Sequence, residues 1–516
     1  MALGADVWTA DKAEHEHDIN ILGTPLGRLA YMAHFADARV EKEQQLLVEI
    51  EKLPDLQCAW VMLSMSAVPR ANHMIRMVPP SQSGTYAQAH DTALWECFCR
   101  LCGATGLQDD TLARDIATLP GRLSGLGLRS AARTARAAYW ASWATCLPVI
   151  AEKNPGFALS VQRHFEIGGG AAALCEAEEV RSVYASQGAE MPSWSAIAEG
   201  ATPPQPADGL DAMDMDRGWQ CHLSSFAENH FRELTVLPRC SPSRRALMLS
   251  QGSGAASAWL RAVPSETALR MTSLRFQTAV RRRLRWPIPL SVGICCRGCK
   301  LELDPLGDRA ASCPTAGRLR LRAGLLERTW ARVLREAGGR VRDRVALRDT
   351  ALPNIDPADG RQIEIVATRL PIAHGKPVAV DATLISPLHA DGTPWAKAAT
   401  TPGVSFDRAR KSKCTTYWEL VGSNVIELVT AAAEVGGRLS REAYELVDAA
   451  AALRASEEPR VLRRQAARAW RARWLTMLSV AVQETVAATM VTEGTRVLDA
   501  ASGTAPTGVD VWLDEA

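Results

Sequence analysis

Two apolar runs separated by a short turn most constrain how this chain can fold. The segments "QIEIVAT" (362–368) and "VAVDATLI" (378–385) place apolar, often β-branched residues at successive positions. Such runs are typical of strands that are buried on both faces of a sheet. Each run nevertheless contains one carboxylate, Glu364 in the first and Asp381 in the second. Because ionised carboxylates are rarely buried alone, both require a cation or a hydrogen-bond donor nearby.

The sequence around the two runs predicts an α/β unit. We expect a helix in "GRLRLRAGLLERTWARVLREAGG" (317–339), because its apolar residues recur at helical spacing and it closes on Gly338. The alternation in "RVRDRVALRD" (340–349) predicts an edge strand. Further along, we expect a helix over 406–421, a strand over 425–432 and a helix over 440–455. The order is therefore α-β-β-β-α-β, followed by helices.

The whole chain has 516 residues, of which 47% are hydrophobic and 22% charged, which suits a soluble multidomain protein. We expect a mainly α N-terminal half and an α/β domain after it. The predicted parts are a helical region (1–185), a Pro-rich and then acidic linker (186–217), a helical basic segment (218–290), a cysteine-containing segment (291–317), the α/β core (318–436) and C-terminal helices (437–516).

Positive charge is concentrated in the centre of the chain. Residues 261–350 contain 20 Arg and Lys but only 8 Asp and Glu, whereas the whole chain has a net charge of +2. Nineteen of the twenty are Arg, whose planar guanidinium matches phosphate oxygens, so a nucleic acid is the expected partner. The densest stretch, "RRRLRW", predicts a backbone-contact patch, and a solvated helix face is the alternative; its members are Arg281, Arg282, Arg283 and Arg285, beside Trp286.

The termini and cysteines favour an intracellular protein. The first residues, "MALGADVWTADKAEHEHD", are polar and acidic, unlike a secretory signal peptide. The 13 cysteines are scattered, which fits a reducing compartment. The late apolar stretch "WLTMLSVAVQETVAATMV" (474–491) contains Gln483 and Glu484, so we expect a buried or amphipathic helix and no membrane partner.

A divalent cation would account for both strand carboxylates. Glu364 and Asp381 on adjacent strands could together hold Mg²⁺ or Mn²⁺ through hard oxygen ligands. Such a metal activates water and neutralises a phosphate oxyanion during hydrolysis. The alternative is a structural ion pair between Asp381 and an arginine such as Arg361 or Arg369.

The next predicted helix offers cations for the same site. It contains Lys411 and Lys413, with Tyr417 one turn further on, whereas Thr383 follows the second carboxylate at the position where a lysine would be expected. Glu327, on the helix before the sheet, is a candidate third carboxylate.

This order of elements with two acids and a lysine resembles the PD-(D/E)XK restriction-like nuclease fold. More narrowly, it resembles the C-terminal endonuclease of early-branching non-LTR (LINE-type) retrotransposons, in which the lysine lies on the following helix and a tyrosine comes soon after. The resemblance implies that Glu364 and Asp381 bind Mg²⁺ or Mn²⁺ and that Lys413 or Lys411, with Tyr417, completes the catalytic site. Here "IE" replaces the usual Pro-Asp pair, and 16 residues separate the two acids.

Two upstream segments resemble the same proteins. "CCRGCKLELDPLGDRAASC" is similar to the Cys-Cys-His-Cys zinc knuckle, which implies Zn²⁺ on Cys296, Cys299 and Cys313. Arg309 stands at the histidine position, so Cys295 or the distant His222 is the candidate fourth ligand. "INILGTPLG" (19–27) and much of residues 1–185 resemble the region after a reverse-transcriptase palm, the thumb and connection. "FADA" (35–38) lacks the second acid of the polymerase signature, so we expect no polymerase activity from this chain alone.

Three readings of the function follow. The resemblance implies a metal-dependent DNA endonuclease in a retrotransposon-derived protein, acting on nuclear DNA, although no targeting signal stands out. The alternative is a catalytically inactive remnant that binds DNA or RNA through its arginine-rich centre. A third reading is a decayed product without a selected activity.

Overall fold

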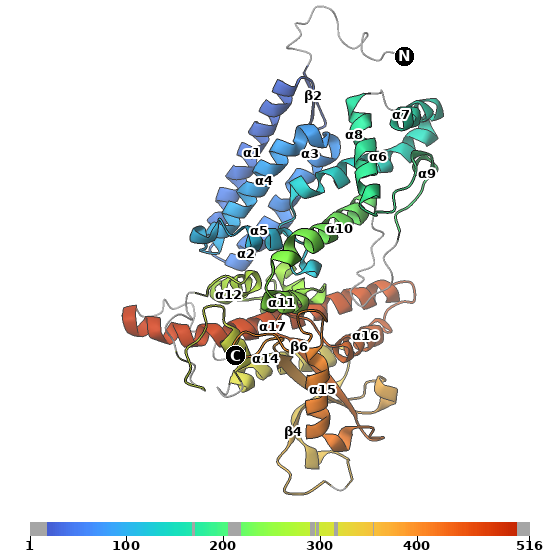
Figure 1. The fold of residues 1–516 in the computed structure, drawn as a ribbon. Coiled ribbons are helices and arrows are strands. Elements are labelled where there is room, and N and C mark those ends of the chain that lie inside the picture. Colours follow the sequence, from blue (N-terminus) through green and yellow to red (C-terminus); the bar gives the residue numbers. More distant parts are fainter. Residues whose placement is uncertain are drawn as a thin grey trace, which may run out of the picture. The chain divides into compact units, whose positions relative to one another are not determined.

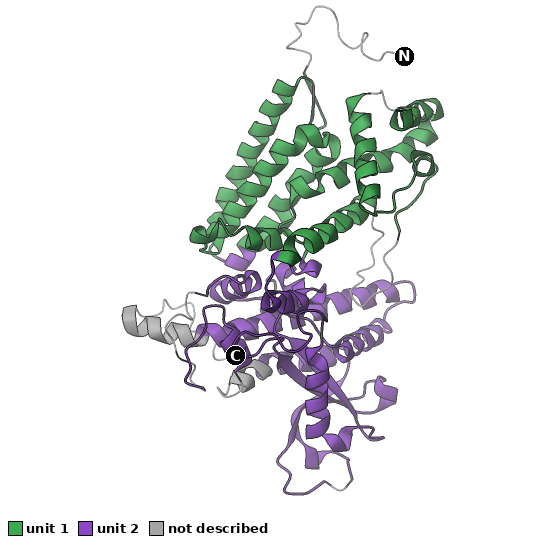
Figure 2. Cartoon of the chain, in the orientation of Figure 1, with its two compact units in different colours: residues 1–54, 59–120, 126–238 green, residues 55–58, 121–125, 239–516 purple. Residues whose placement is uncertain are grey.

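The chain divides into two compact units (Figure 2). The computed structural model describes residues 18–167, 171–204, 218–288, 295, 299–313, 318–353 and 355–502, without the side chains of 318–323 and 492–502. Unit 1 comprises residues 1–54, 59–120 and 126–238, and unit 2 comprises residues 55–58, 121–125 and 239–516. The N-terminal half is mainly helical and the C-terminal part contains a small mixed sheet, as the sequence predicted.

Unit 1 consists of helices and one short hairpin (Figure 1). Its elements are β1 (Ile19–Ile21), β2 (Thr24–Leu26), α1 (Leu29–Glu51), α2 (Leu56–Met62, which begins in unit 2), α3 (Asn72–Met77), α4 (Pro80–Leu101), α5 (Thr111–Thr118), α6 (Ala131–Lys153), α7 (Pro155–Ile167), α8 (Ala172–Ser186), α9 (Trp194–Ala198) and α10 (Trp219–Phe231). Ser130 is the N-cap of α6, because its hydroxyl accepts a hydrogen bond from the Arg133 amide at 3.0 Å.

Aromatic packing around α6 also alters the interpretation of the predicted linker. Trp140 on α6 is fully buried, and its ring lies 5.6 Å from that of Trp194 on α9. Trp194 in turn stacks on Phe165 of α7 with ring centroids 3.8 Å apart. Residues 186–204 are thus partly anchored in the core of unit 1, because a tryptophan in this Pro-rich segment finds an apolar partner. The rest of the predicted linker, 205–217, lies outside the described residues.

Unit 2 contains the predicted α/β order (Figure 1). Its elements are α11 (Pro242–Gln251), α12 (Ser273–Leu284), α13 (Asp308–Ser312), α14 (Arg318–Glu336), β3 (Arg340–Ala346), β4 (Gln362–Thr368), β5 (Val378–Ile385), α15 (Ser405–Thr416), β6 (Glu427–Glu434), α16 (Arg441–Ala455) and α17 (Arg463–Ser502). The predicted basic segment 218–290 is divided between the units, since α10 belongs to unit 1 whereas α11 and α12 belong to unit 2.

The sheet has the strand order β3-β4-β5-β6. The first two pairings are antiparallel and the last is parallel, and the predicted edge strand is indeed the edge strand β3. Ile365 and Val380 pack on one face in a core that includes Trp330 of α14. Ala379 faces the opposite way, in a second core with Tyr417 at the end of α15. Cover on both faces explains why the two central strands have continuous apolar sequences.

The late apolar stretch forms most of α17. By length and composition alone, residues 463–491 of this helix could cross a membrane, but 78% of its most apolar window is buried inside the protein. Trp474, Met477 and Leu478 are fully buried in the core that also contains α14. This stretch is therefore a buried helix in unit 2, as the sequence predicted.

Candidate functional site

The sheet register places the two strand carboxylates next to each other. The paired residues of β4 and β5 end at Ile365 and Val380, and Glu364 and Asp381 are the next residue of each strand beyond that pair. The charge of Asp381 acts on the Glu364 carboxyl, so the two side chains are neighbours. The Ala382 amide donates a hydrogen bond of 2.6 Å to Glu364 Oε2, which holds this carboxylate across β5.

Helix α15 supplies the cation. Lys413 Nζ lies 2.8 Å from Asp381 Oδ1, and the Thr383 hydroxyl donates to the same oxygen at 2.8 Å. Asp381 is 1% exposed. Of the two predicted lysines, Lys413 therefore reaches the carboxylates, whereas Lys411 is exposed to solvent. The predicted pairing of Asp381 with Arg361 does not form, because Arg361 binds Asp359 and Glu419.

Tyr417 fixes the end of α15 against the sheet. Its hydroxyl donates a hydrogen bond of 2.6 Å to the Gln362 carbonyl, two residues before Glu364 on β4. Burial, and then the charges of Asp381 and Glu364, raise the pKa of Tyr417. Because its proton is held by a backbone carbonyl, Tyr417 positions the lysine helix rather than acting as an acid.

Negative charge is poorly compensated at this site. Burial, followed by the charge of Asp381, raises the pKa of Glu364 to about 8. Burial also raises the pKa of Glu327 on α14, and the charge of Asp381 adds to this effect. The second oxygen of Asp381, Oδ2, is buried without a hydrogen-bond partner among the described residues. Glu364 and Asp381 thus share Lys413, whereas Glu327 also lies near Arg344 and Arg328. An additional cation would stabilise the two strand carboxylates.

The donor set fits a hard divalent cation. Glu364 and Asp381 offer carboxylate oxygens, one of which has no partner in the part of the chain that the structure describes. Within the described residues, no three His, Cys, Asp or Glu side chains are close enough to form a metal site by themselves. Mg²⁺ commonly keeps several waters and binds one or two protein carboxylates, so this pair is a suitable ligand set for it.

The prediction that the arginine cluster contacts a nucleic-acid backbone is wrong for its three consecutive members. Arg281, Arg282 and Arg283 on α12 are only 6%, 5% and 4% exposed. Arg283 donates to the carbonyls of Gly125, Gly121 and Gln251. The Arg281 guanidinium donates to the Pro287 carbonyl, and that of Arg282 to the Leu306 carbonyl. Arg285, the fourth member, donates to both carboxylate oxygens of Asp308 at 2.7 Å. These side chains satisfy backbone carbonyls and a buried carboxylate inside unit 2 instead of facing solvent.

We expect Arg283→Met to destabilise unit 2 by about 3 kcal/mol, since it removes three hydrogen bonds from a buried guanidinium to backbone carbonyls. Urea denaturation followed by circular dichroism would measure this loss. Arg261→Met is the matched control, because Arg261 is exposed on the same unit. If Arg283→Met weakened nucleic-acid binding while leaving stability unchanged, the structural role would be refuted.

The cysteine segment is only partly described. Cys296 lies outside the described residues. Cys313 is 1% exposed in the core of unit 2, Cys299 packs against that core, and Cys295 is exposed. His222, a candidate fourth ligand, belongs to unit 1. The Zn²⁺ site therefore stays a prediction.

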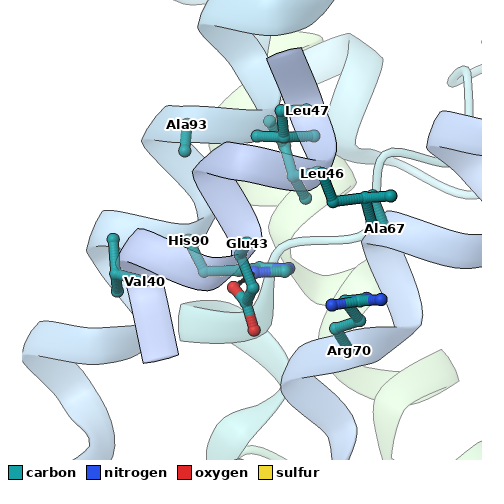
Figure 3. A pocket seen from close by; sticks show the side chains of 9 residues that line it. Val40, Glu43, Leu46, Leu47, Ala67, Arg70, His90 and Ala93 are labelled. Atoms are coloured by element: carbon teal, nitrogen blue, oxygen red, sulfur yellow. Dashed lines mark hydrogen bonds and ion pairs between the residues drawn. The ribbon is translucent and has the colours of Figure 1, made fainter. Parts of the chain in front are cut away.

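Unit 1 contains a second buried acidic group that the sequence did not reveal. Glu43 on α1 accepts hydrogen bonds of 2.7 Å from the Tyr86 hydroxyl and from His90 Nδ1, both on α4. Figure 3 shows Glu43 beside His90 in a small pocket. The pocket has about 10 Å³ of free space, roughly enough for one water molecule, so it is unsuited to an organic substrate. The only sequence signal was a polar residue on the buried face of each helix.

We expect Tyr86→Phe to lower the free energy of unfolding by about 2 kcal/mol near neutral pH, because Glu43 loses a buried donor. Burial opposes ionisation of Glu43, but the hydrogen bonds from His90 and Tyr86 lower its pKa overall. The stabilisation is therefore present above the ordinary glutamate pKa and is lost as the pH falls through the lowered value. Urea unfolding at several pH values tests this, with Tyr31→Phe as control. Equal stability of the two variants would contradict it.

Compared with known proteins, the chain matches no protein-family model and no curated protein.

Proposed function

We propose that unit 2 is a metal-dependent DNA endonuclease of the restriction-like PD-(D/E)XK type, within a retrotransposon-derived protein. The observation that carries this proposal is the contact between Lys413 and the buried Asp381, with Glu364 close by on the neighbouring strand. The mixed sheet with α14 before it and α15 between β5 and β6 has the element order of that fold.

Each side chain has a role in phosphodiester hydrolysis under this proposal. Glu364 and Asp381 would hold Mg²⁺ or Mn²⁺, which supplies Lewis-acid activation of water and charge neutralisation at the phosphate. Lys413, which contacts Asp381, would orient the attacking water and stabilise negative charge on the phosphate. Tyr417 and Thr383 keep the lysine helix and Asp381 in position. Glu327 adds negative charge that strengthens cation binding.

The uncompensated charge favours a metal site over a structural ion pair. A structural pair would need only one carboxylate and one lysine. Here a second carboxylate with a raised pKa and an orphaned Asp381 oxygen accompany that pair. Unpaired buried acids destabilise a fold, and they are commonly found where a function requires them.

Nicking of supercoiled plasmid by the purified full chain tests the proposal. We expect conversion to open circles in Mg²⁺ or Mn²⁺ and none in excess chelator. Intact plasmid with both metals, from protein shown to be folded by circular dichroism, would overturn the proposal. Salt-sensitive DNA or RNA binding without cleavage would instead support the inactive binding remnant.

A further inference from the structure

One aromatic side chain next to the candidate site is unusually exposed. Trp418 directly follows Tyr417 and is 68% exposed. It is the only tryptophan among the strongly exposed large apolar side chains of the described residues, whereas seven others are almost completely buried. A tryptophan left in solvent forgoes a large gain from burial and is therefore a candidate contact residue.

The exposure of Trp418 is fixed by its neighbours. Tyr417 before it and Leu420 after it are 6% and 1% exposed and belong to the second core of the sheet. Arg361, which precedes β4, donates to the Thr416 carbonyl and pairs with Glu419. The short 3₁₀ turn Trp418–Leu420 is thus anchored on both sides, and its indole is presented outward on a rigid base.

Positive charge lies on the helix that leads into this turn. Lys411 and Thr415 on α15 are exposed, and the exposed Trp418 follows in the 3₁₀ turn after the helix ends at Thr416. Asp407 also lies exposed near the start of α15, but the acid nearest to the tryptophan, Glu419, is neutralised by Arg361. An exposed ammonium and an exposed planar ring on consecutive elements match a nucleic-acid strand, because the ammonium binds phosphate and the ring stacks on a base.

We propose that the exposed end of α15 and the turn after it bind an unpaired nucleotide strand next to the cleavage site, with Trp418 stacking on a base and Lys411 contacting a phosphate. This inference rests on the proposed function and deepens it, because bases in an intact duplex are already stacked on each other. The preferred substrate is therefore DNA that is single-stranded or opened near the cut.

Fluorescence anisotropy of the full chain with labelled single-stranded and blunt duplex oligonucleotides tests the inference. All variants carry Asp381→Asn, so that cleavage does not interfere. We expect Trp418→Ala to weaken single-strand binding about tenfold and duplex binding much less, while Trp418→Phe retains most of the affinity. Lys411→Ala should reduce the salt dependence of single-strand affinity by the amount expected for the loss of about one phosphate contact.

Val421→Ala is the matched control, since Val421 is 51% exposed next to the same turn but has no aromatic face. Unchanged single-strand binding by Trp418→Ala would overturn the inference, as would equal losses for both oligonucleotides or for Val421→Ala. If Trp418→Ala changed the oligomeric state on gel filtration but left nucleic-acid binding intact, Trp418 would contact a second copy of the chain. That result would also overturn the inference. Plasmid nicking is measured separately. A protein that binds single strands through Trp418 but does not cut plasmid would contradict only the nuclease proposal.

Discussion

Replacement of Asp381 by Asn is expected to reduce plasmid nicking by at least about a hundredfold. Asn has nearly the same shape as Asp, and its side-chain oxygen can still accept the hydrogen bond from the Thr383 hydroxyl, so the fold should persist. It lacks the charge that pairs with Lys413 and that would hold a divalent cation. Metal neutralisation of a phosphate supplies several kcal/mol of transition-state stabilisation, and each 1.36 kcal/mol corresponds to a factor of ten in rate. Initial nicking rates at saturating Mg²⁺ or Mn²⁺ measure the effect.

The matched control is Asp343→Asn on the edge strand β3. Asp343 pairs with Arg335, but both side chains are about half exposed, so this ion pair contributes little to stability. We expect wild-type nicking from this variant. Lys413→Met should also reduce the rate strongly, because Lys413 contacts Asp381 directly. Nicking that survives Asp381→Asn with unchanged rate would place the catalytic centre elsewhere.

The α/β part of the fold could be predicted from sequence because its signals are local. The runs 362–368 and 378–385 match β4 and β5 to the residue, since strands covered on both faces require continuous apolar sequence. Gly338, with φ +96°, follows α14 where the left-handed conformation required a glycine. The buried position of Trp194 was not predicted, because its partner Phe165 is distant in sequence.

For the site residues too, features set by local sequence could be predicted, whereas features set by contacts between distant residues could not. Glu364 and Asp381 lie just beyond the last pair of β4 and β5, and the apolar pattern of the two strands favours this register. The choice of Lys413 over Lys411 depends on the rotation of α15 about its axis, which sequence spacing did not settle. The arginines of α12 were misassigned, because the sequence shows their charge but not the carbonyls of residues 121 and 125 that accept their hydrogen bonds.

Glu364→Gln is expected to stabilise the metal-free protein at pH 8 on the order of 3 kcal/mol. Burial and the charge of Asp381 raise the pKa of Glu364 from its ordinary 4.5 to about 8. Between these two values the folded protein binds more protons than the unfolded chain, so stability falls as the pH rises. The glutamine is neutral at every pH and its oxygen can still accept from the Ala382 amide, so its unfolding free energy should be nearly constant across this window.

A divalent cation should make the wild type more stable than Glu364→Gln, which reverses their order of stability. Mg²⁺ or Mn²⁺ at about a hundred times its dissociation constant stabilises a binding protein by about 2.7 kcal/mol. Because Glu364 is an expected ligand, the wild type should gain this stability at pH 8 while Glu364→Gln gains much less. Thermal unfolding with and without metal measures the stability of both proteins, with Glu445→Gln as an exposed acidic control on α16. If Glu364→Gln matched the wild type in pH profile and metal response, Glu364 would be a buried structural acid, and the proposed metal site would lose one of its two carboxylates.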